Sequence, residues 1–347
     1  MTVKQRIAAL IREKGPIPFE EFMDVALYGD GGFFADDTLR SQRSGDFLTS
    51  PEVSRLFGET LAVYVEAERE RIGQPFQVVD VGAGSGSLLR PMLDVIEVAA
   101  VVVEASSAAR RTLAEAVPEA SVRTDLPGSI KGVVIANELI DNLPMAMAQR
   151  VGETWRERWV GLDGNDLAFI DTEPRLEVLD WLDRFAGDVE DGGWVEVQLE
   201  AQSWLRKVLE SLEAGSVMII DYGDTAENLI PRRRDGTLRT YRAHHLGPHP
   251  LDEPGETDIT ADVNFTALIA TAEEAGAQVE LHRQDDFLAG LGLRDRLSAM
   301  RKAELEAARA GDEMKRLRLR TRKTEAETLL HPRGLGDFRV LTCRSHG

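Results

Sequence analysis

The chain has 347 residues, with 41 Lys and Arg against 60 Asp and Glu, which gives a net charge of -19. With 43% hydrophobic residues, this is the composition of a soluble globular protein that can bury one large core or two smaller ones. So negative a chain repels phosphate backbones and anionic lipid, which disfavours nucleic acid and membranes as partners. A cationic substrate or a basic protein fits the charge better.

The single cysteine, Cys343, rules out an internal disulfide, so a reducing, cytoplasmic location is expected. No apolar run approaches the ~20 residues that a membrane-spanning helix needs. The first residues predict a surface helix, because Val3, Ile7, Leu10 and Ile11 fall on one helical face. An amphipathic organelle-targeting segment has a similar pattern and stays open as an alternative.

A second helical stripe runs from Ile17 to Leu27, after the helix break at Gly15 and Pro16. The Gly- and Asp-rich loop 29–51 that follows is long for a connector, and long ordered loops are usually lids or binding loops. At its end, Thr49 and Glu52 match a capping box for a helix reaching roughly to Arg71.

From Phe76 onward, short β-rich runs alternate with helices, which is typical of a parallel sheet. The expected strands are 76–81, 99–104, 121–123, 132–136, 216–221, 278–282 and 338–343, with helices at 87–97, 106–117 and 293–330. Residues 151–212 interrupt this alternation with a hairpin (155–162 and 167–171), two helices and a strand at 194–199. We therefore expect N-terminal helices and a lid (1–75), a core (76–150 and 213–347) and an insertion packed on that core (151–212).

The most informative segment is the run VDVGAGSGS, residues 79–87, which lies between a strand and a helix. Glycines there let a ligand approach the backbone and meet free N–H groups. A dinucleotide fold expects G-x-G-x-x-G, but here the third glycine comes one residue early and Asp80 stands two before the first. This pattern is the one seen in S-adenosylmethionine (SAM) methyltransferases. Glu104 ends the next strand, where a carboxylate can accept both ribose hydroxyls.

The fourth strand ends in ANELIDNLP, residues 136–144. Ligands of open α/β sheets lie beyond the carboxyl ends of the strands, so this segment is expected to face the reacting methyl group. Asn137 offers a donor and an acceptor, while Glu138 and Asp141 are three residues apart and can point the same way from one turn. Alternatively, these acidic residues only complement a helix dipole.

Several segments together resemble the MidA-like family of class I SAM-dependent methyltransferases. These segments are GDFLTSPEVS (45–54), VDVGAGSGSL (79–88), ANELIDNLP (136–144), IIDYG (219–223), PGETDITADVNF (254–265) and LLHPRGLGDFRVL (329–341), and the match runs from Gly15 to Leu341. The mitochondrial member of that family is a complex I assembly factor that methylates an arginine of a complex I subunit. The chain departs from the family pattern at Phe33 and Phe34 (commonly tyrosines), at Asn142 (alanine) and at 262–264 (His-Val-Asp), whereas the expected SAM contacts lie elsewhere.

The resemblance implies an α/β fold with a Rossmann-like class I methyltransferase sheet, helices on both faces, an N-terminal helical and lid extension, and an insertion between the fourth and fifth strands. It also implies that loop 45–49 closes over the cofactor. The residues expected to bind SAM are Asp80, Gly82, Ala83, Gly84, Gly86, Glu104, Asn137 and Thr49. The expected catalytic residues are Glu138, then Asp141, then Asp46 of the lid.

Tyr222, Tyr241 and His244 are weaker candidates for a substrate pocket, and both tyrosines equally fit a core ring with a hydrogen-bonded hydroxyl. His244 lies near two other histidines, yet no Cys or spaced acidic set completes a metal site, so no metal is expected. The basic run 315–323 is interspersed with acidic residues and predicts a solvated helix face.

The function predicted from these residues and the resemblance is SAM-dependent methyl transfer to an arginine of a protein substrate. A carboxylate can grip a guanidinium bidentately, which is why Glu138 leads the catalytic candidates. The alternatives are a small-molecule N- or O-methyltransferase and a SAM-binding assembly factor that acts through contact with a partner; a dinucleotide-dependent oxidoreductase is more remote. The sequence leaves a homo-oligomer open.

Overall fold

Runs of Val, Ile and Ala form the middle of a seven-stranded sheet with the order β16-β17-β10-β5-β2-β3-β4. Its strands are β2 (Gln77–Val81), β3 (Ala99–Val103), β4 (Ser121–Arg123), β5 (Ile130–Asn137), β10 (Leu212–Asp221), β16 (Gln278–Arg283) and β17 (Arg339–Arg344). The strands from β10 to β4 are parallel, whereas β17 pairs antiparallel with both β10 and β16. The computed structural model describes residues 1–35, 49–229, 234–242 and 245–345.

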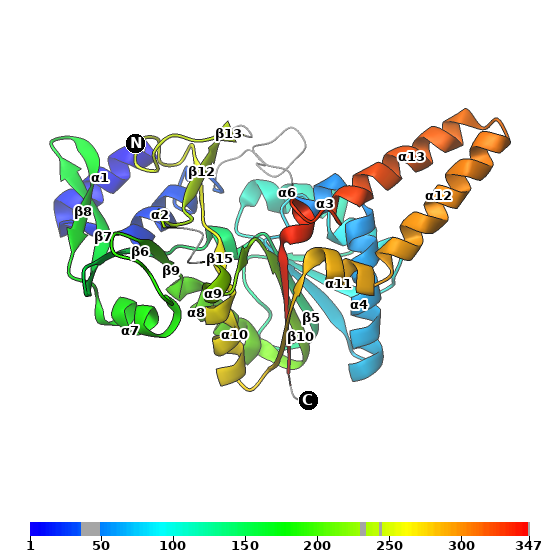
Figure 1. Ribbon diagram of the computed structural model, residues 1–347, viewed down its shortest axis with the longest axis horizontal. Helices are drawn as coiled ribbons and strands as arrows, with labels where there is room; N and C mark the ends of the chain where they lie inside the picture. The colour runs from blue at the N-terminus through cyan, green and yellow to red at the C-terminus, as the bar shows by residue number, and fades with distance from the viewer. Residues whose placement is uncertain (36–48, 230–233, 243–244, 346–347) are drawn as a thin grey trace.

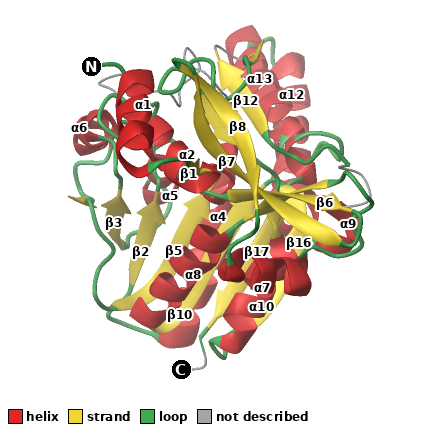
Figure 2. Ribbon diagram, turned by 90° about the vertical axis from the view of Figure 1, so that its left-hand side faces the viewer, coloured by secondary structure: helices red, strands yellow, loops and turns green. Residues whose placement is uncertain are grey.

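Both faces of the sheet are buried, which explains why its strands read as continuous apolar runs. On one face, Val78 and Val102 pack with α4, α5, α6 and α11. On the other, their neighbours Val79 and Val103 pack with α8 and α10. The covering helices are α4 (Leu56–Ile72), α5 (Leu89–Leu93), α6 (Ser107–Ala116), α8 (Leu199–Ser211), α10 (Phe265–Glu274) and α11 (Gln284–Gly290). Figure 2 shows β3, β2, β5 and β10 side by side, so their carboxyl ends share one edge.

A second, five-stranded sheet lies beside the first. It contains β1 (Ile17–Pro18), β6 (Ala146–Val151), β7 (Thr154–Asp163), β8 (Asp166–Thr172) and β9 (Trp194–Val197), and it packs with α1 (Val3–Lys14), α2 (Phe19–Leu27) and α7 (Leu176–Phe185). The hairpin β7–β8 matches the sequence expectation. Strand β6, however, begins before the expected insertion, the N-terminal region contributes β1, and α8 belongs to the central sheet because its apolar stripe packs there.

The remaining elements are short, apart from one long helical hairpin. Among the described residues, the short ones are α3 (Ser50–Val53), α9 (Ala226–Leu229), β11 (Gly223–Asp224), β12 (Arg239–Arg242), β13 (His245–Leu246), β14 (Asp258–Thr260), β15 (Val263–Asn264) and the 3-10 turns η1 (Ile140–Asn142) and η3 (Leu335–Asp337). The hairpin consists of α12 (Leu293–Arg309) and α13 (Glu313–Thr328) and projects from the body (Figure 1). In the part of the chain that the structure describes, no helix is long and apolar enough to cross a membrane.

The capping box expected at Thr49 and Glu52 is wrong. Thr49 takes the N-cap position of α3 (Ser50–Val53) without a side-chain capping hydrogen bond. Glu52 lies instead beside the glycine turn, with Ser85 Oγ donating to it at 3.4 Å. Ser54 adopts an extended conformation, which ends α3 and separates it from α4.

Candidate active site

The glycine turn after β2 has the backbone that only glycine adopts readily. Gly82, Gly84 and Gly86 have φ angles of 71, 53 and 79°, in the left-handed region that is costly for residues with a Cβ atom. The Gly84 N–H donates a hydrogen bond of 3.1 Å to Glu104 Oε2. The turn and the end of the neighbouring strand β3 are thereby joined into one surface.

Glu104 has both carboxylate oxygens held by backbone N–H groups. Oε1 accepts from Ser106 N at 2.8 Å, and Oε2 accepts from Gly84. Burial raises the pKa of Glu104, and these hydrogen bonds oppose that rise. Since a carboxylate offers about four lone pairs, Glu104 can still accept hydroxyl donors from a ligand.

Asp80 lies at the same edge and is only 2% exposed. Its Oδ2 atom is buried and has no hydrogen-bond partner among the described residues. Burial, together with the charge of Glu104, raises the pKa of Asp80 to about 7. A buried carboxyl without a donor is costly, so this position favours a bound cationic or donor group.

Glu138 follows β5 and has a φ of 51°, a strained value for a residue other than glycine. Its own N–H donates to Ile220 O at 2.8 Å, which anchors the turn to β10. The carboxylate oxygen Oε1 accepts from Ser50 N at 3.1 Å and from Asn137 Nδ2 at 3.2 Å. Burial raises the pKa of Glu138 to about 8, and Asp141 adds to the rise.

These segments enclose a cavity of about 280 Å³. Among the expected site residues, it is lined by Asp80, Gly82, Ala83, Gly84, Glu104, Asn137, Glu138 and Thr49. Gly86 instead faces α6, where an added Cβ would approach Leu113 and Val117 to 3.1 Å. A glycine at position 86 therefore allows α6 to pack closely against the turn that follows β2.

Asp141 does not line this cavity; it is buried behind the cavity wall. Its Oδ2 atom accepts hydrogen bonds from the hydroxyl of Tyr222 and, at 2.7 Å, from Thr260. Burial raises the pKa of Asp141, and burial likewise raises the pKa of nearby Asp221. Glu138 and Asp141 are thus directed to different hydrogen-bond partners rather than to one ligand.

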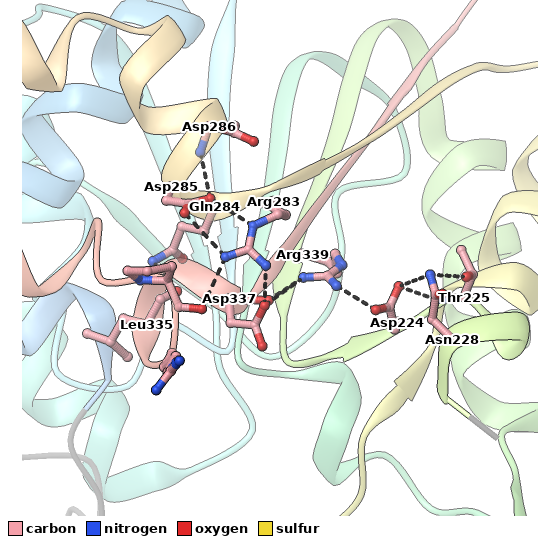
Figure 3. A network of polar contacts seen from close by, with 12 residues as sticks. Asp224, Thr225, Asn228, Arg283, Gln284, Asp285, Asp286, Leu335, Asp337 and Arg339 are labelled. Carbon is pink, nitrogen blue, oxygen red and sulfur yellow. Dashed lines mark hydrogen bonds and ion pairs between the residues drawn. The ribbon is translucent and has the colours of Figure 1, made fainter. Parts of the chain in front are cut away.

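Tyr222 and Tyr241 line a second hollow of about 510 Å³. Its charged side chains are largely paired with one another: Arg339 contacts Asp224 at 2.5 Å, and Arg239 contacts Asp262 at 2.9 Å. Figure 3 shows how this network continues through Asp337 to Arg283. The hollow therefore presents balanced charge.

Two expected site residues, Asp46 and His244, lie outside the described residues. Within the described ranges, no group of three or more His, Cys, Asp or Glu side chains could hold a metal ion.

Several residues that line the cavity are not among the expected site residues, and Tyr28, Phe34 and Glu52 are three of them. Tyr28 and Phe34 come from the N-terminal region and stack with their ring centroids 5.6 Å apart. Glu52 also lines the cavity. The sequence pattern around Glu52 fits helix capping and does not indicate a cavity position. Tyr28 carries no local signal, because only the tertiary fold brings it to Asn142 in the segment after β5.

Comparison with known proteins identifies the fold and the cofactor. The matching family model, Methyltransf_28, described as "Putative S-adenosyl-L-methionine-dependent methyltransferase", covers residues 60–282, which is more than half of the chain. The chain belongs to this family. Its cofactor is SAM, and the predicted class I methyltransferase fold and family resemblance are confirmed. The cavity fits such a cofactor. The glycine turn leaves room for a ligand beside the backbone, and Asp80 Oδ2 has no hydrogen-bond donor among the described residues.

A crystal structure from Burkholderia thailandensis is similar along almost the whole chain. It is described as a "likely methyl transferase" bound to S-adenosyl-homocysteine, has a TM-score of 0.87 and 27% identity, and the match covers 99% of this chain and 92% of that one. Curated relatives include Protein arginine methyltransferase NDUFAF7, mitochondrial, from Xenopus tropicalis (28% identity, 84% of this chain, 75% of the relative) and from Homo sapiens (26%, 84% and 73%).

The cytoplasmic location predicted from the cysteine content is contradicted by these relatives. The proteins from Drosophila melanogaster, Xenopus tropicalis and Homo sapiens are all named as mitochondrial. A single buried cysteine shows only that no internal disulfide forms. It therefore cannot distinguish one reducing compartment of the cell from another.

Proposed function

We propose that this methyltransferase acts on a nitrogen of an arginine side chain in a protein substrate. The observation that carries the proposal is the buried carboxylate of Glu138 in the wall of the cofactor cavity. No Lys, Arg or His is among the described residues that line this cavity, so a cationic acceptor meets no like charge from them. The relatives named protein arginine methyltransferase support the same substrate class.

In this proposal, SAM would supply the methyl group and leave as S-adenosyl-homocysteine, and the acceptor nitrogen would lose one proton to solvent. The protein would position the acceptor for this in-line displacement. Asp80, the glycine turn and Glu104 would hold the cofactor, because they line one cavity and offer two carboxylates beside a backbone that has no Cβ atoms at its glycines. Asn137 and Glu138 would meet the acceptor, since the loop after β5 faces the same space. Thr49, which comes from the N-terminal region, also lines the cavity.

Glu138 has two tasks in this scheme. Its carboxylate binds the guanidinium through charge-assisted hydrogen bonds and concentrates electron density on the attacking nitrogen. It also stabilises the positive charge while the nitrogen is alkylated. Its raised pKa suits this role, because a buried carboxyl that is costly to ionise alone gains most from a cationic partner.

Methylation of whole proteomes, compared by mass spectrometry between cells with and without the protein, tests the proposal. We expect methylarginine to disappear from a small set of proteins, and purified enzyme with radiolabelled SAM to restore it. Label that enters only a low-mass fraction would contradict a protein substrate. Label on lysine or on a protein terminus would contradict arginine.

A further inference from the structure

A groove adjoins the cofactor cavity on the side of the loop that follows β5. It has a volume of about 640 Å³, and Tyr28 and Leu143 line both the groove and the cavity. Tyr28 is fixed at this junction, because its hydroxyl donates to Asn142 O at 3.1 Å. A chain lying in the groove therefore passes directly beside the cavity in which methyl transfer is proposed.

Part of the groove lining is apolar, and we call this part the floor. Pro18, Leu143, Pro144 and Leu199 line it together with the ring of Tyr28. Lysine and arginine side chains bury their aliphatic stems on such surfaces while their charged heads stay at the rim. The floor thus suits a long basic side chain better than a short acidic one.

The rest of the lining, which we call the rim, is charged and mostly acidic. Glu20, Glu21, Asp24 and Glu200 line it against one basic residue in the described lining, Arg175. The charge of Arg175 is already offset, because its guanidinium lies 2.7 Å from both Glu20 and Glu157 and 3.4 Å from Glu177.

Two acidic residues of the rim form ion pairs with exposed lysines. Lys14 pairs with Glu21 at 3.0 Å, and Lys207 pairs with Glu200 at 3.7 Å; the side chains of both lysines are more than half exposed. Exposed pairs of this kind are weak and readily exchange for a ligand. Partial desolvation and the neighbouring charge of Glu21 raise the pKa of Asp24, so a cation at this rim relieves repulsion between carboxylates.

We propose that this groove binds a lysine or arginine that flanks the acceptor arginine, so that the enzyme selects substrate proteins with a basic segment at the methylation site. The inference rests on the proposed function for the identity of the acceptor. It adds a second contact, outside the cofactor cavity, that determines which arginine is chosen. Complementary charge at such a contact mainly increases the association rate and the specificity.

Direct peptide binding tests the groove without requiring turnover. The full-length protein loaded with S-adenosyl-homocysteine is titrated with fluorescent peptides that contain one arginine, flanked by Lys, Ser or Glu. We expect the Lys-flanked peptide to bind about tenfold more tightly than the Glu-flanked one, which corresponds to ~1.4 kcal/mol. The difference should shrink with added salt, because exposed charges are screened.

The double variant Asp24→Asn with Glu200→Gln should lose most of this preference and raise KM for the Lys-flanked peptide, with SAM affinity unchanged. Each lost ion pair at an exposed rim is expected to cost about threefold in affinity. The matched control is Glu210→Gln with Glu306→Gln, which changes the net charge equally at exposed helix positions. It should keep the preference. Asp24→Lys should shift the preference toward the Glu-flanked peptide.

The inference is overturned if the wild-type protein binds all three peptides equally, or if the control loses as much preference as the groove variant. Failure of the proposed function would look different. In that case the basic-flanked peptide would bind in the groove, but no methyl group would reach its arginine in the presence of SAM.

Discussion

The backbone N–H of Ser50 donates a hydrogen bond of 3.1 Å to the carboxylate of Glu138, although the two residues are 88 positions apart. Ser50 begins α3, directly after the segment expected to form a lid. Its side chain is also held, because Gln284 Nε2 donates to Ser50 Oγ at 3.3 Å. The position of α3 therefore influences the ionisation and orientation of the carboxylate that we assign to the acceptor.

Replacing Glu138 by Gln should separate catalysis from cofactor binding. The amide keeps the size of the side chain but loses the charge that grips a guanidinium. Truncating one partner of a buried charge pair costs ~2 to 5 kcal/mol, so the turnover rate should fall on the order of 10²-fold or more. The SAM dissociation constant, measured by calorimetry, should change far less. A large loss of SAM affinity would instead place Glu138 in the cofactor site.

Asp141→Asn is the matched comparison, since it is equally isosteric and lies three residues away. Its carboxylate is occupied by Tyr222 and Thr260 behind the cavity wall. We therefore expect a smaller loss of turnover than for Glu138→Gln, with any effect arising from the shared loop. Steady-state rates of the two variants under one set of conditions decide this. Equal, slight losses in both would remove the main physical support for an arginine acceptor.

The pKa of Glu138 predicts a specific pH dependence. With a pKa of about 8, its carboxyl is mostly protonated at neutral pH in the free enzyme, and only the ionised form binds a guanidinium. The value of kcat/KM should therefore increase as pH rises and level off above about pH 8. For the Glu138→Gln variant, kcat/KM should not show this increase with pH. If wild type and variant share the same profile, another group is responsible.

Much of the central sheet could be predicted from sequence, because strands buried on both faces have unmistakable apolar runs. The expected strand 76–81 corresponds to β2, and 216–221 lies within β10. The glycine turn and Glu104 were also predictable as neighbours, since the carboxyl ends of parallel strands meet at one edge.

Features that depend on contacts between distant segments could not be predicted in this way. The junction of Tyr28 with Asn142 joins residues 114 positions apart, and neither has a local pattern that indicates it. The direction of Asp141 likewise depends on Thr260, which reaches it from β14. Sequence spacing placed Glu138 and Asp141 on one turn, but hydrogen bonds with other elements determine where each carboxylate points.

The glycine turn provides a test of cofactor binding. Gly84 has a φ of 53°, and a valine there would be strained and would place a branched side chain in the cavity. We expect Gly84→Val to abolish SAM binding in calorimetry while circular dichroism still reports a folded protein. Unchanged SAM affinity in a folded variant would contradict the assignment of this turn to the cofactor.

Asp80 should make SAM binding depend on pH. Its pKa of about 7 means that the folded protein without cofactor keeps this carboxyl half protonated near neutrality, whereas a positively charged ammonium of the cofactor favours the ionised form. SAM affinity should therefore increase between pH 6 and pH 8, with protons released on binding. Calorimetry in two buffers of different ionisation enthalpy counts those protons. The Asp80→Asn variant should bind SAM more weakly at pH 8 and with less dependence on pH.

The raised pKa of Asp80 also affects the free energy of unfolding. Measuring the stability of the Asp80→Asn variant therefore shows whether weaker SAM binding arises from a destabilised fold. Because the folded state holds this proton more tightly than an unfolded chain, whose aspartates titrate near 3.8, the contribution of Asp80 to stability is present at low pH and is lost as pH rises through about 7. Relative to wild type, Asp80→Asn should therefore gain unfolding free energy between pH 5 and pH 8 in urea melts. The opposite result is that Asp80→Asn binds SAM more weakly and that its stability relative to wild type is lower at pH 8 than at pH 5. This result would show that Asp80 stabilises the fold rather than binding the cofactor.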